Sequence, residues 1–223
     1  LDYPEVCRKV LILDWDVHHG NGIQNMFYED PNVLYISLHV YQNGQFYPGQ
    51  PEDPGVPDGG LENCGAGRGM GKNINIGWAE QGVGNGEYMA AFQKIVMPIA
   101  QEFDPDLVIV SAGFDAAAGD ELGGCYVTPA CYSHMTHMLM SLANGKVAVC
   151  LEGGYNLHAI SRSALAVAKT LMTDSVLFIM GSLMLAFAYP FMKRITYWPQ
   201  LFLGLTFNWG IIMGWVSIAN SIS

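Results

Sequence analysis

The segment of residues 10–22, VLILDWDVHHGNG, most constrains what this chain can fold into. It begins as an apolar run and then places Asp14, Asp16 and His18 at every second position. Because the side chains of a strand alternate between its two faces, this period predicts a buried strand with all three polar groups on one side. Carboxylate oxygens and an imidazole nitrogen suit zinc. The alternative for this segment alone is a strand end whose acids hydrogen-bond to nearby loops.

Two later segments repeat the pattern of an apolar run that ends in polar residues. Residues 107–115 read LVIVSAGFD and end at Asp115, and residues 147–155 read VAVCLEGGY and end at Tyr155. In open parallel sheets, ligands bind just beyond the carboxyl ends of the strands, so we expect these residues to lie near the first segment. Three protein ligands leave a fourth position on the metal for water or substrate. The predicted ligands are Asp16, His18 and Asp115.

The motifs DWDVHHGNG, SAGFDA and LEGGYN, in this order, resemble those of the zinc-dependent histone deacetylases, specifically the class II branch. The similarity extends over residues 1–172 and corresponds to the C-terminal part of the catalytic domain. It implies an α/β fold of the arginase and deacetylase type, a truncated parallel sheet with flanking helices. The implied activity is zinc-dependent hydrolysis of acetyl-lysine amides on histones or other proteins. The resemblance assigns Zn²⁺ to the ligands Asp16, His18 and Asp115.

The resemblance also gives roles to residues around the predicted zinc ion. Tyr155 matches the phenol that polarises the substrate carbonyl, where a nearly inactive subset of class II enzymes carries His. Gly153 and Gly154 permit a tight turn that aims Tyr155 at the site. The positions that hold a monovalent cation, K⁺, beside the zinc are matched by Asp14, Ser37 and Leu38. The wall of the acyl-lysine tunnel is matched by Phe46 and Tyr47, together with the two glycines.

Hydrolysis at such a site also needs proton transfer. Zinc lowers the pKa of its bound water and polarises the amide oxygen, and Tyr155 would donate a hydrogen bond to the developing oxyanion. A general base must still take the proton of the water. In the family a tandem His pair upstream of the first motif does so, and we expect this pair to be absent from a sequence that starts at Leu1. His19 is not predicted to replace it, because it should point away from His18.

The arginase group shares this sheet but binds two manganese ions. Its second metal needs another carboxylate two residues after the histidine, where this chain has Gly20. A site for a single metal ion is therefore predicted.

The charge of the chain restricts its partners. All 20 acidic residues and 8 of the 10 basic residues lie at or before Asp174. This acidic part argues against direct binding of nucleic acid, which needs a basic patch, and is compatible with a basic acetylated histone tail. The resemblance adds corepressor subunits as partners and the nucleus or cytoplasm as the location. The five cysteines form no CxxC pair, which favours free thiols in a reducing compartment.

The composition changes after Asp174. Residues 175–192 and 195–223 contain no charged side chain, and Lys193 and Arg194 separate them. The first run has 18 residues, which as a helix would extend ~27 Å, close to the hydrocarbon thickness of a bilayer. Flanking aromatic residues strengthen the prediction of an α-helical membrane hairpin over residues 175–223. The alternative is a pair of buried helices in a globular core.

This tail has a resemblance of its own. Residues 189–210, YPFMKRITYWPQLFLGLTFNWG, are similar to the 4-hydroxybenzoate polyprenyltransferases, which form a helical membrane bundle and bind magnesium through two Asp-rich motifs. Residues 175–223 contain no Asp or Glu, so no prenyltransferase activity is expected of them. Two partial families joined near residues 172–174 indicate a fusion or a mis-joined gene product. The alternative function is therefore a catalytically dead deacetylase remnant, anchored to a membrane by the tail.

The remaining patterns predict alternating strands and helices, as in parallel α/β proteins. The predicted strands are residues 10–14, 33–38, 74–76, 107–111 and 147–151, and the predicted helices are residues 86–103, 129–143 and 157–172. Residues 41–70 are rich in Gly and Pro and predict a long loop, either functional or disordered. His39 is interpreted as a hydrogen-bonded buried histidine, and the alternative is a residue that supports the predicted site from behind. Asp120 and Glu121 are interpreted as part of a solvated loop, whereas the resemblance implies that this stretch supports the site.

Overall fold

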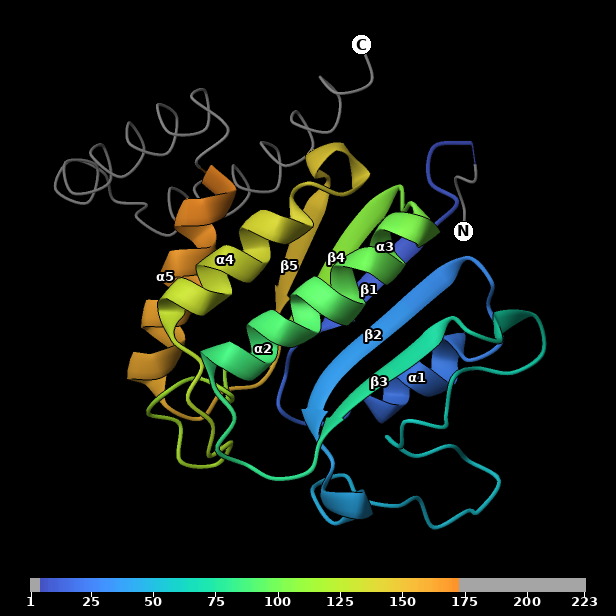
Figure 1. The fold of residues 1–223 in the computed structure, drawn as a ribbon, viewed down its shortest axis with the longest axis horizontal. Coiled ribbons are helices and arrows are strands. Elements are labelled where there is room, and N and C mark those ends of the chain that lie inside the picture. The colour runs from blue at the N-terminus through green and yellow to red at the C-terminus, as the bar shows by residue number, and fades with distance from the viewer. Residues whose placement is uncertain (1–4, 173–223) are drawn as a thin grey trace, which may run out of the picture. The chain divides into compact units, whose positions relative to one another are not determined.

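The computed structural model describes residues 5–172. This part of the chain contains a five-stranded parallel sheet in the order β3-β2-β1-β4-β5 (Figure 1). The strands are β1 (Val10–Asp14), β2 (Val33–Val40), β3 (Asn73–Trp78), β4 (Leu107–Ala112) and β5 (Val147–Leu151). The prediction of a parallel α/β sheet is confirmed.

Helices cover both faces of this sheet. Figure 1 shows α2, α3 and α4 on one face and α1 on the other. The helices are α1 (Asn21–Phe27), α2 (Asn85–Ala91), α3 (Met97–Phe103), α4 (Pro129–Leu139) and α5 (Leu157–Met172). A π-helical segment, η3 (Phe92–Val96), joins α2 to α3, and the 3₁₀ turns are η1 (Gln42–Gly44), η2 (Gly67–Gly69) and η4 (Ala143–Gly145).

The central strand β1 brings the predicted site residues together. It pairs with β2 on one side and with β4 on the other, and all five of its residues are buried. Asp14, the last residue of β1, lies in register with Ser37 of β2 and Ser111 of β4. Because parallel strands end at the same edge, the segments that follow β1 and β4 emerge side by side.

An aromatic cluster packs beneath these two segments. The ring of Tyr132 in α4 contacts Trp15 edge-on at 5.5 Å between centroids and Phe114 at 5.1 Å. All three side chains are at most 2% exposed. Aromatic pairs of this geometry contribute about 0.5–1.5 kcal/mol each beyond the burial of their area. Since Trp15 precedes Asp16 and Phe114 precedes Asp115, this packing holds the backbone of both acidic residues.

Some boundaries differ from the sequence-based prediction. The strand period does not continue through residue 18, because β1 ends at Asp14 and the chain then bends. The helix predicted over 129–143 ends at Leu139, and a 3₁₀ turn follows. Helix α1 was not predicted, because it has only seven residues, and its apolar face is short, with Ile23 and Phe27 packed against the core. Residues 41–70 form the expected long loop, with short 3₁₀ turns near each end.

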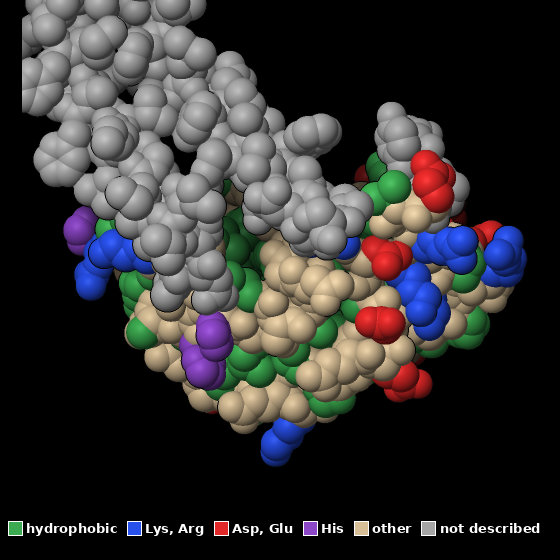
Figure 2. Space-filling view, turned by 90° about the horizontal axis from the view of Figure 1, so that it is seen from above, with side chains coloured by type: hydrophobic (Ala, Val, Ile, Leu, Met, Phe, Trp, Pro, Cys, Tyr) green, Lys and Arg blue, Asp and Glu red, His purple; other side chains and the backbone are tan. Residues whose placement is uncertain are grey.

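Charged residues of both signs are interspersed at the amino ends of the strands. Figure 2 views this end from above and shows acidic and basic side chains next to one another. The carboxylate of Asp106 accepts the backbone N–H groups of Arg8 at 2.8 Å and Lys9 at 3.0 Å. The same contacts, with the charge of Lys146, hold the pKa of Asp106 below its usual value. Acidic and basic side chains thus lie close together at the amino ends of the strands, the end of the sheet opposite Asp16 and Asp115.

Residues Leu1–Ala168 form one compact unit of the chain. Among residues 5–172, no helix combines the length and the apolar character needed to cross a bilayer. The hairpin predicted for residues 175–223 lies outside the described residues.

Candidate metal centre

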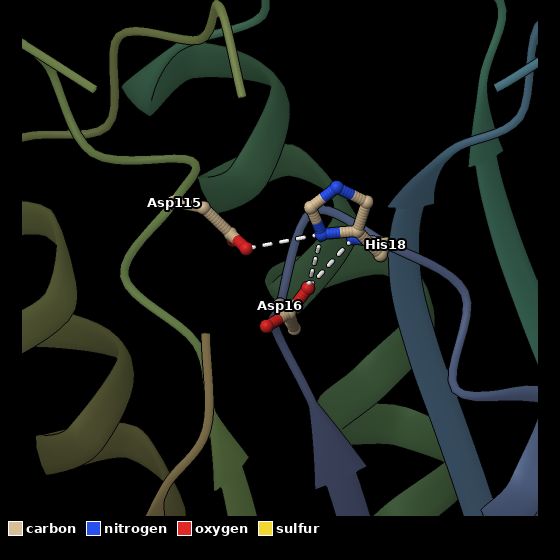
Figure 3. A group of neighbouring side chains, drawn as sticks. All are labelled: Asp16, His18 and Asp115. Atoms are coloured by element: carbon tan, nitrogen blue, oxygen red, sulfur yellow. Dashed lines mark hydrogen bonds and ion pairs between the residues drawn. The ribbon is translucent and has the colours of Figure 1, made fainter. Parts of the chain in front are cut away.

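Asp16, His18 and Asp115 converge at the carboxyl ends of β1 and β4 (Figure 3). His18 Nδ1 lies 2.9 Å from Asp16 Oδ1 and 3.1 Å from Asp115 Oδ2. Ligand atoms that surround a tetrahedral zinc ion at about 2.0–2.1 Å lie roughly 3.3 Å apart, so these spacings fit a single ion with little movement. Of residues 5–172, these three form the one group of acidic, His or Cys side chains close enough to share a metal.

The electrostatics of this group favour a positive charge at its centre. Burial opposes protonation of His18, but its hydrogen bonds with Asp115 and Asp16 outweigh burial and raise its pKa to about 9. Burial raises the pKa of Asp115, whose side chain is fully buried, and the neighbouring carboxylate of Asp16 adds to this. Two carboxylates held this close repel each other unless a cation lies between them. The donor set therefore fits a divalent ion such as Zn²⁺.

Backbone N–H groups orient the two carboxylates. Asp16 Oδ1 accepts the N–H of His18 at 2.8 Å, and Asp16 Oδ2 accepts the N–H of Gly153 at 3.1 Å. Asp115 Oδ1 accepts the N–H of Val17 at 2.8 Å. Each carboxylate thus keeps an oxygen facing His18 while hydrogen bonds to the backbone restrict its rotation. Contacts of this kind improve metal affinity because the ligands need little rearrangement.

Three aromatic rings surround the imidazole of His18. Phe46 stacks on it with 5.3 Å between ring centroids, while Tyr47 and Tyr155 approach edge-on at 5.9 Å and 6.1 Å. Tyr47 and Tyr155 are 76% and 62% exposed, so both phenols face solvent at the rim. The sequence-based prediction assigned these three residues to the site, and the structure brings all of them to His18.

Comparison with protein-family models decides the family. The model described as "Histone deacetylase domain" matches residues 2–171 of the 223 in this chain. This chain belongs to the histone deacetylase family. The resemblance of its motifs is therefore confirmed at the level of the family.

Curated histone deacetylases are similar to this chain over its first three quarters. Histone deacetylase clr3 of Schizosaccharomyces pombe is 61% identical over 76% of this chain, and histone deacetylase HDA1 of Saccharomyces cerevisiae is 57% identical over 78%. In each case the match covers 24% of the relative, so this chain spans about a quarter of their length. These relatives support the class II branch indicated by the motifs.

Solved structures of histone deacetylases have the same fold. The structure of the histone deacetylase Clr3 superposes with a TM-score of 0.73 at 60% identity, covering 76% of this chain and 28% of that one. The HDA15 HD domain superposes with a TM-score of 0.70 at 53% identity, covering 78% of this chain and 48% of that one. A second family model, the UbiA prenyltransferase family, matches residues 159–223, most of which lie outside the described part of the chain.

The glycine turn of this deacetylase-family chain packs directly on the candidate ligands Asp16 and Asp115. Gly153 donates its N–H to Asp16 and accepts the N–H of Phe114 through its carbonyl at 2.8 Å. A Cβ atom on Gly153 would overlap the carboxylates of both Asp16 and Asp115. Gly154 has a φ of +137°, a conformation that side-chain-bearing residues rarely adopt. Both positions therefore require glycine.

We expect Gly153→Ala to weaken zinc binding by more than about 10-fold, because the new methyl group must displace one of the two carboxylates. Gly86→Ala is the matched control, since a Cβ atom at Gly86 meets nothing within 4 Å. Competition with a fluorescent zinc chelator measures both affinities. Equal affinities for the two variants would contradict this packing.

The residues predicted to bind K⁺ lie on β1 and β2. Asp14 and Ser37 are opposite each other in register, and both are buried. Burial raises the pKa of Asp14 to about 8, although a hydrogen bond of 2.8 Å from the hydroxyl of Tyr35 partly offsets this effect. Leu38, also buried, follows Ser37 on the strand.

The sequence-based prediction missed Gln24, which ties the long loop to the sheet. Its side chain is fully buried in α1. Its Nε2 donates to the carbonyls of Pro57 at 3.0 Å and Asp58 at 2.9 Å. Its Oε1 lies within 3.1 Å of three donors, which are His19 Nε2, Asn73 Nδ2 and Asn75 Nδ2. Gln24 thereby fixes the loop that carries Phe46 and Tyr47.

This network also accounts for the two histidines next to the site. His19 turns away from the metal ligands towards Gln24, and burial lowers its pKa. His39 is fully buried between Ser37 Oγ at 2.8 Å and the carbonyl of Gly59 at 2.9 Å, and burial lowers its pKa to about 3. The interpretation of His39 as a hydrogen-bonded buried histidine is confirmed.

We expect Gln24→Ala to lower the free energy of unfolding by about 2–4 kcal/mol, because it leaves buried donors and carbonyls without their partner. Gln101→Ala, which truncates an exposed glutamine of α3, is the control. Urea denaturation measures the free energy of unfolding of both variants, and the m-value should stay unchanged. A loss below about 1 kcal/mol for Gln24→Ala would show that water replaces the lost contacts.

Proposed function

We propose that residues 1–172 are the C-terminal part of a zinc-dependent lysine deacetylase domain that hydrolyses acetyl-lysine amides. The observation that carries this proposal is the convergence of Asp16, His18 and Asp115 beside the rim residue Tyr155. Three protein ligands and an open fourth position are typical of catalytic zinc sites, whereas structural zinc sites use four protein ligands. The match to the deacetylase family supports this assignment.

Each residue around the centre has a role in this proposal. Asp16, His18 and Asp115 would hold the ion, which when bound supplies Lewis acidity and an activated water. The hydroxyl of Tyr155 donates a hydrogen bond to the substrate carbonyl oxygen as negative charge develops there. Phe46 and Tyr47 form one wall of the acyl-lysine tunnel, flank the aliphatic stem of the acetylated lysine and keep water away from it. The Gly153–Gly154 turn forms the other wall.

The general base in this proposal is the tandem His pair that the family carries upstream of the first motif. The described histidines near the centre are otherwise engaged, because His18 is a proposed ligand, His19 bonds to Gln24, and His39 bonds to Ser37 and the carbonyl of Gly59. The alternative is a deacetylase remnant that binds zinc or a partner without turnover.

A monovalent cation site beside the zinc is the second part of the proposal. The carboxylate of Asp14 is buried, and Asp14 lies in register with Ser37 on the neighbouring strand. Asp14 Oδ1 also accepts the backbone N–H of Asp16 at 3.1 Å. A K⁺ ion held by Asp14 and by the segment of Ser37 and Leu38 would offset the cost of burying this carboxylate.

The substrate in this proposal is an acetylated histone tail or another acetyl-lysine protein. Corepressor subunits are proposed as partners, and the nucleus or cytoplasm as the location. The support comes from the family and from the excess of acidic residues before Asp174, which favours a basic substrate over nucleic acid.

Metal analysis together with an activity assay tests the function. We expect the purified chain to hold about one zinc ion, and a longer form that also carries the upstream His pair to deacetylate an acetyl-lysine peptide, with turnover lost on chelation and restored by zinc. Zinc without turnover would support the non-catalytic remnant. The absence of both zinc and turnover would overturn the proposal.

For residues 175–223 we propose a membrane hairpin derived from a polyprenyltransferase-like fragment joined to the deacetylase part. The support is the absence of charge in two long runs and the UbiA match over residues 159–223. The chain should then stay in the membrane fraction after a carbonate wash, whereas a variant that ends at residue 172 should be released. Release of both would overturn the hairpin.

A further inference from the structure

The carboxylate of Asp120 connects the two loops that build the site. The solvated loop predicted for this position is wrong for Asp120, which is 3% exposed. It lies five residues after the metal ligand Asp115, in the irregular segment between β4 and α4. It is not one of the residues that converge on the metal position. Its function must therefore be sought in what its two oxygens contact.

Four backbone N–H groups bind this carboxylate. Oδ1 accepts the N–H groups of Leu122 at 3.0 Å and Gly123 at 3.2 Å, which belong to its own turn. Oδ2 accepts the N–H groups of Tyr155 at 2.6 Å and Asn156 at 3.1 Å, which belong to the segment after β5. Oδ1 alone would make an ordinary local turn, but Oδ2 reaches 35 residues along the chain to Tyr155 itself.

The opposite side of the same turn is attached to a metal ligand. Gly153 donates its N–H to Asp16 Oδ2 at 3.1 Å, and its carbonyl accepts the N–H of Phe114. The Gly153–Asn156 segment is therefore fixed at both ends, by Asp16 before the turn and by Asp120 after it. The side chain of Asn156 adds a third attachment, because its Nδ2 donates to the carbonyl of Gly119 at 2.8 Å.

Tyr155 needs such an attachment because its own side chain has little support. The side chain is 62% exposed and its ring touches His18 only edge-on. Gly153 and Gly154 give the preceding backbone unusual freedom. A hydrogen-bond donor for a developing oxyanion is effective only when it is held in place before the reaction. The N–H of Tyr155 is the point at which the backbone of this residue is held.

We infer that Asp120 is a positioning residue that fixes Tyr155 for the hydrolysis of acetyl-lysine. The inference rests on the proposed function, because that function gives Tyr155 its role. A carboxylate is suited to this task, since it accepts two N–H groups with each oxygen. An Asn side chain has the same shape but presents an amide NH₂ to one of the two N–H pairs, so it can satisfy only one loop.

Amide hydrogen exchange in the full chain is the first test. We expect Asp120→Asn to speed exchange at the amides of Tyr155 and Asn156 by at least about 10-fold, with zinc affinity within about 2-fold of the unchanged chain. Asp53→Asn is the matched control, because the carboxylate of Asp53 also accepts a backbone N–H, that of Gly55 at 2.8 Å. Unchanged exchange at both amides would overturn the inference. If Asp120→Asn does not fold, Asp120→Glu keeps the charge and misplaces it by one methylene group.

A double-mutant cycle is the second test, in the zinc-loaded longer form that carries the upstream His pair. Asp120→Asn should lower kcat by about 10-fold or more while KM stays within about 2-fold. In a Tyr155→Phe background the same substitution should change kcat by less than about 2-fold, because the hydroxyl that it positions is gone. An equal loss of kcat in both backgrounds would show that Asp120 stabilises the fold without positioning the hydroxyl of Tyr155. If this longer form had no turnover even with Asp120 and Tyr155 unchanged, the proposed function would fail instead, and amide exchange would then decide the role of Asp120.

Discussion

Asp115→Asn should weaken zinc binding by more than about 100-fold, the largest effect that we expect on the metal. The substitution removes one of the two charges that face His18 and replaces a strong oxygen ligand by a neutral amide. The side chain of Asp115 is fully buried, so no other group or water easily takes its place. Titration with a fluorescent zinc competitor gives the affinity, and the rise in melting temperature with zinc should disappear as well.

A control variant that removes a negative charge far from the centre shows whether zinc affinity falls because a ligand is lost or because the net charge changes. Asp106→Asn deletes a carboxylate that binds Arg8 and Lys9 at the amino ends of the strands. This variant should bind zinc as tightly as the unchanged chain. Equal affinities for Asp115→Asn and Asp106→Asn would mean that zinc is held elsewhere or not at all, and the proposed hydrolase would have no centre.

The convergence of Asp16, His18 and Asp115 could be predicted from the sequence because these residues follow two apolar strands within a few positions. The strands are residues 10–14, with the predicted limits, and residues 107–112, one residue longer than predicted, and parallel strands end at one edge. The reasoning was less accurate at the local level. It extended the strand period to His18, whereas the chain bends after Asp14 and the ligands still converge because Val17 and Gly153 hold the carboxylates.

The contacts of Asp120 and Gln24 could not be predicted from strand patterns, although the resemblance implied that the stretch around Asp120 supports the site. Their partners are backbone groups of residues that are distant in sequence, such as Tyr155 for Asp120 and Pro57 for Gln24. An isolated polar residue in an irregular segment has the same appearance in a sequence whether it is solvated or buried against a backbone turn. Burial of Asp120 depends on the tertiary arrangement of the segments after β4 and β5, which local patterns do not encode.

In the longer form that carries the upstream His pair, Tyr155→Phe should lower kcat for an acetyl-lysine peptide by about 10²–10³-fold and leave zinc affinity within about 2-fold. The ring remains against His18, so only the hydroxyl is lost. Partial burial, together with the charges of Asp115 and Asp16, raises the pKa of Tyr155, so its O–H is retained as a donor at neutral pH. A donor that acts mainly on the developing oxyanion should affect kcat more than KM.

The control for this prediction is Tyr126→Phe, which removes the hydroxyl of another exposed tyrosine, 65% accessible. Kinetics and zinc titration of both variants should differ in kcat alone. If Tyr155→Phe instead lost zinc, the phenol would belong to the metal site and its placement at the rim would be incidental. If neither variant changed kcat, the oxyanion donor would have to be a backbone N–H group, and the edge-on contact between Tyr155 and His18 would serve only to close the wall of the tunnel.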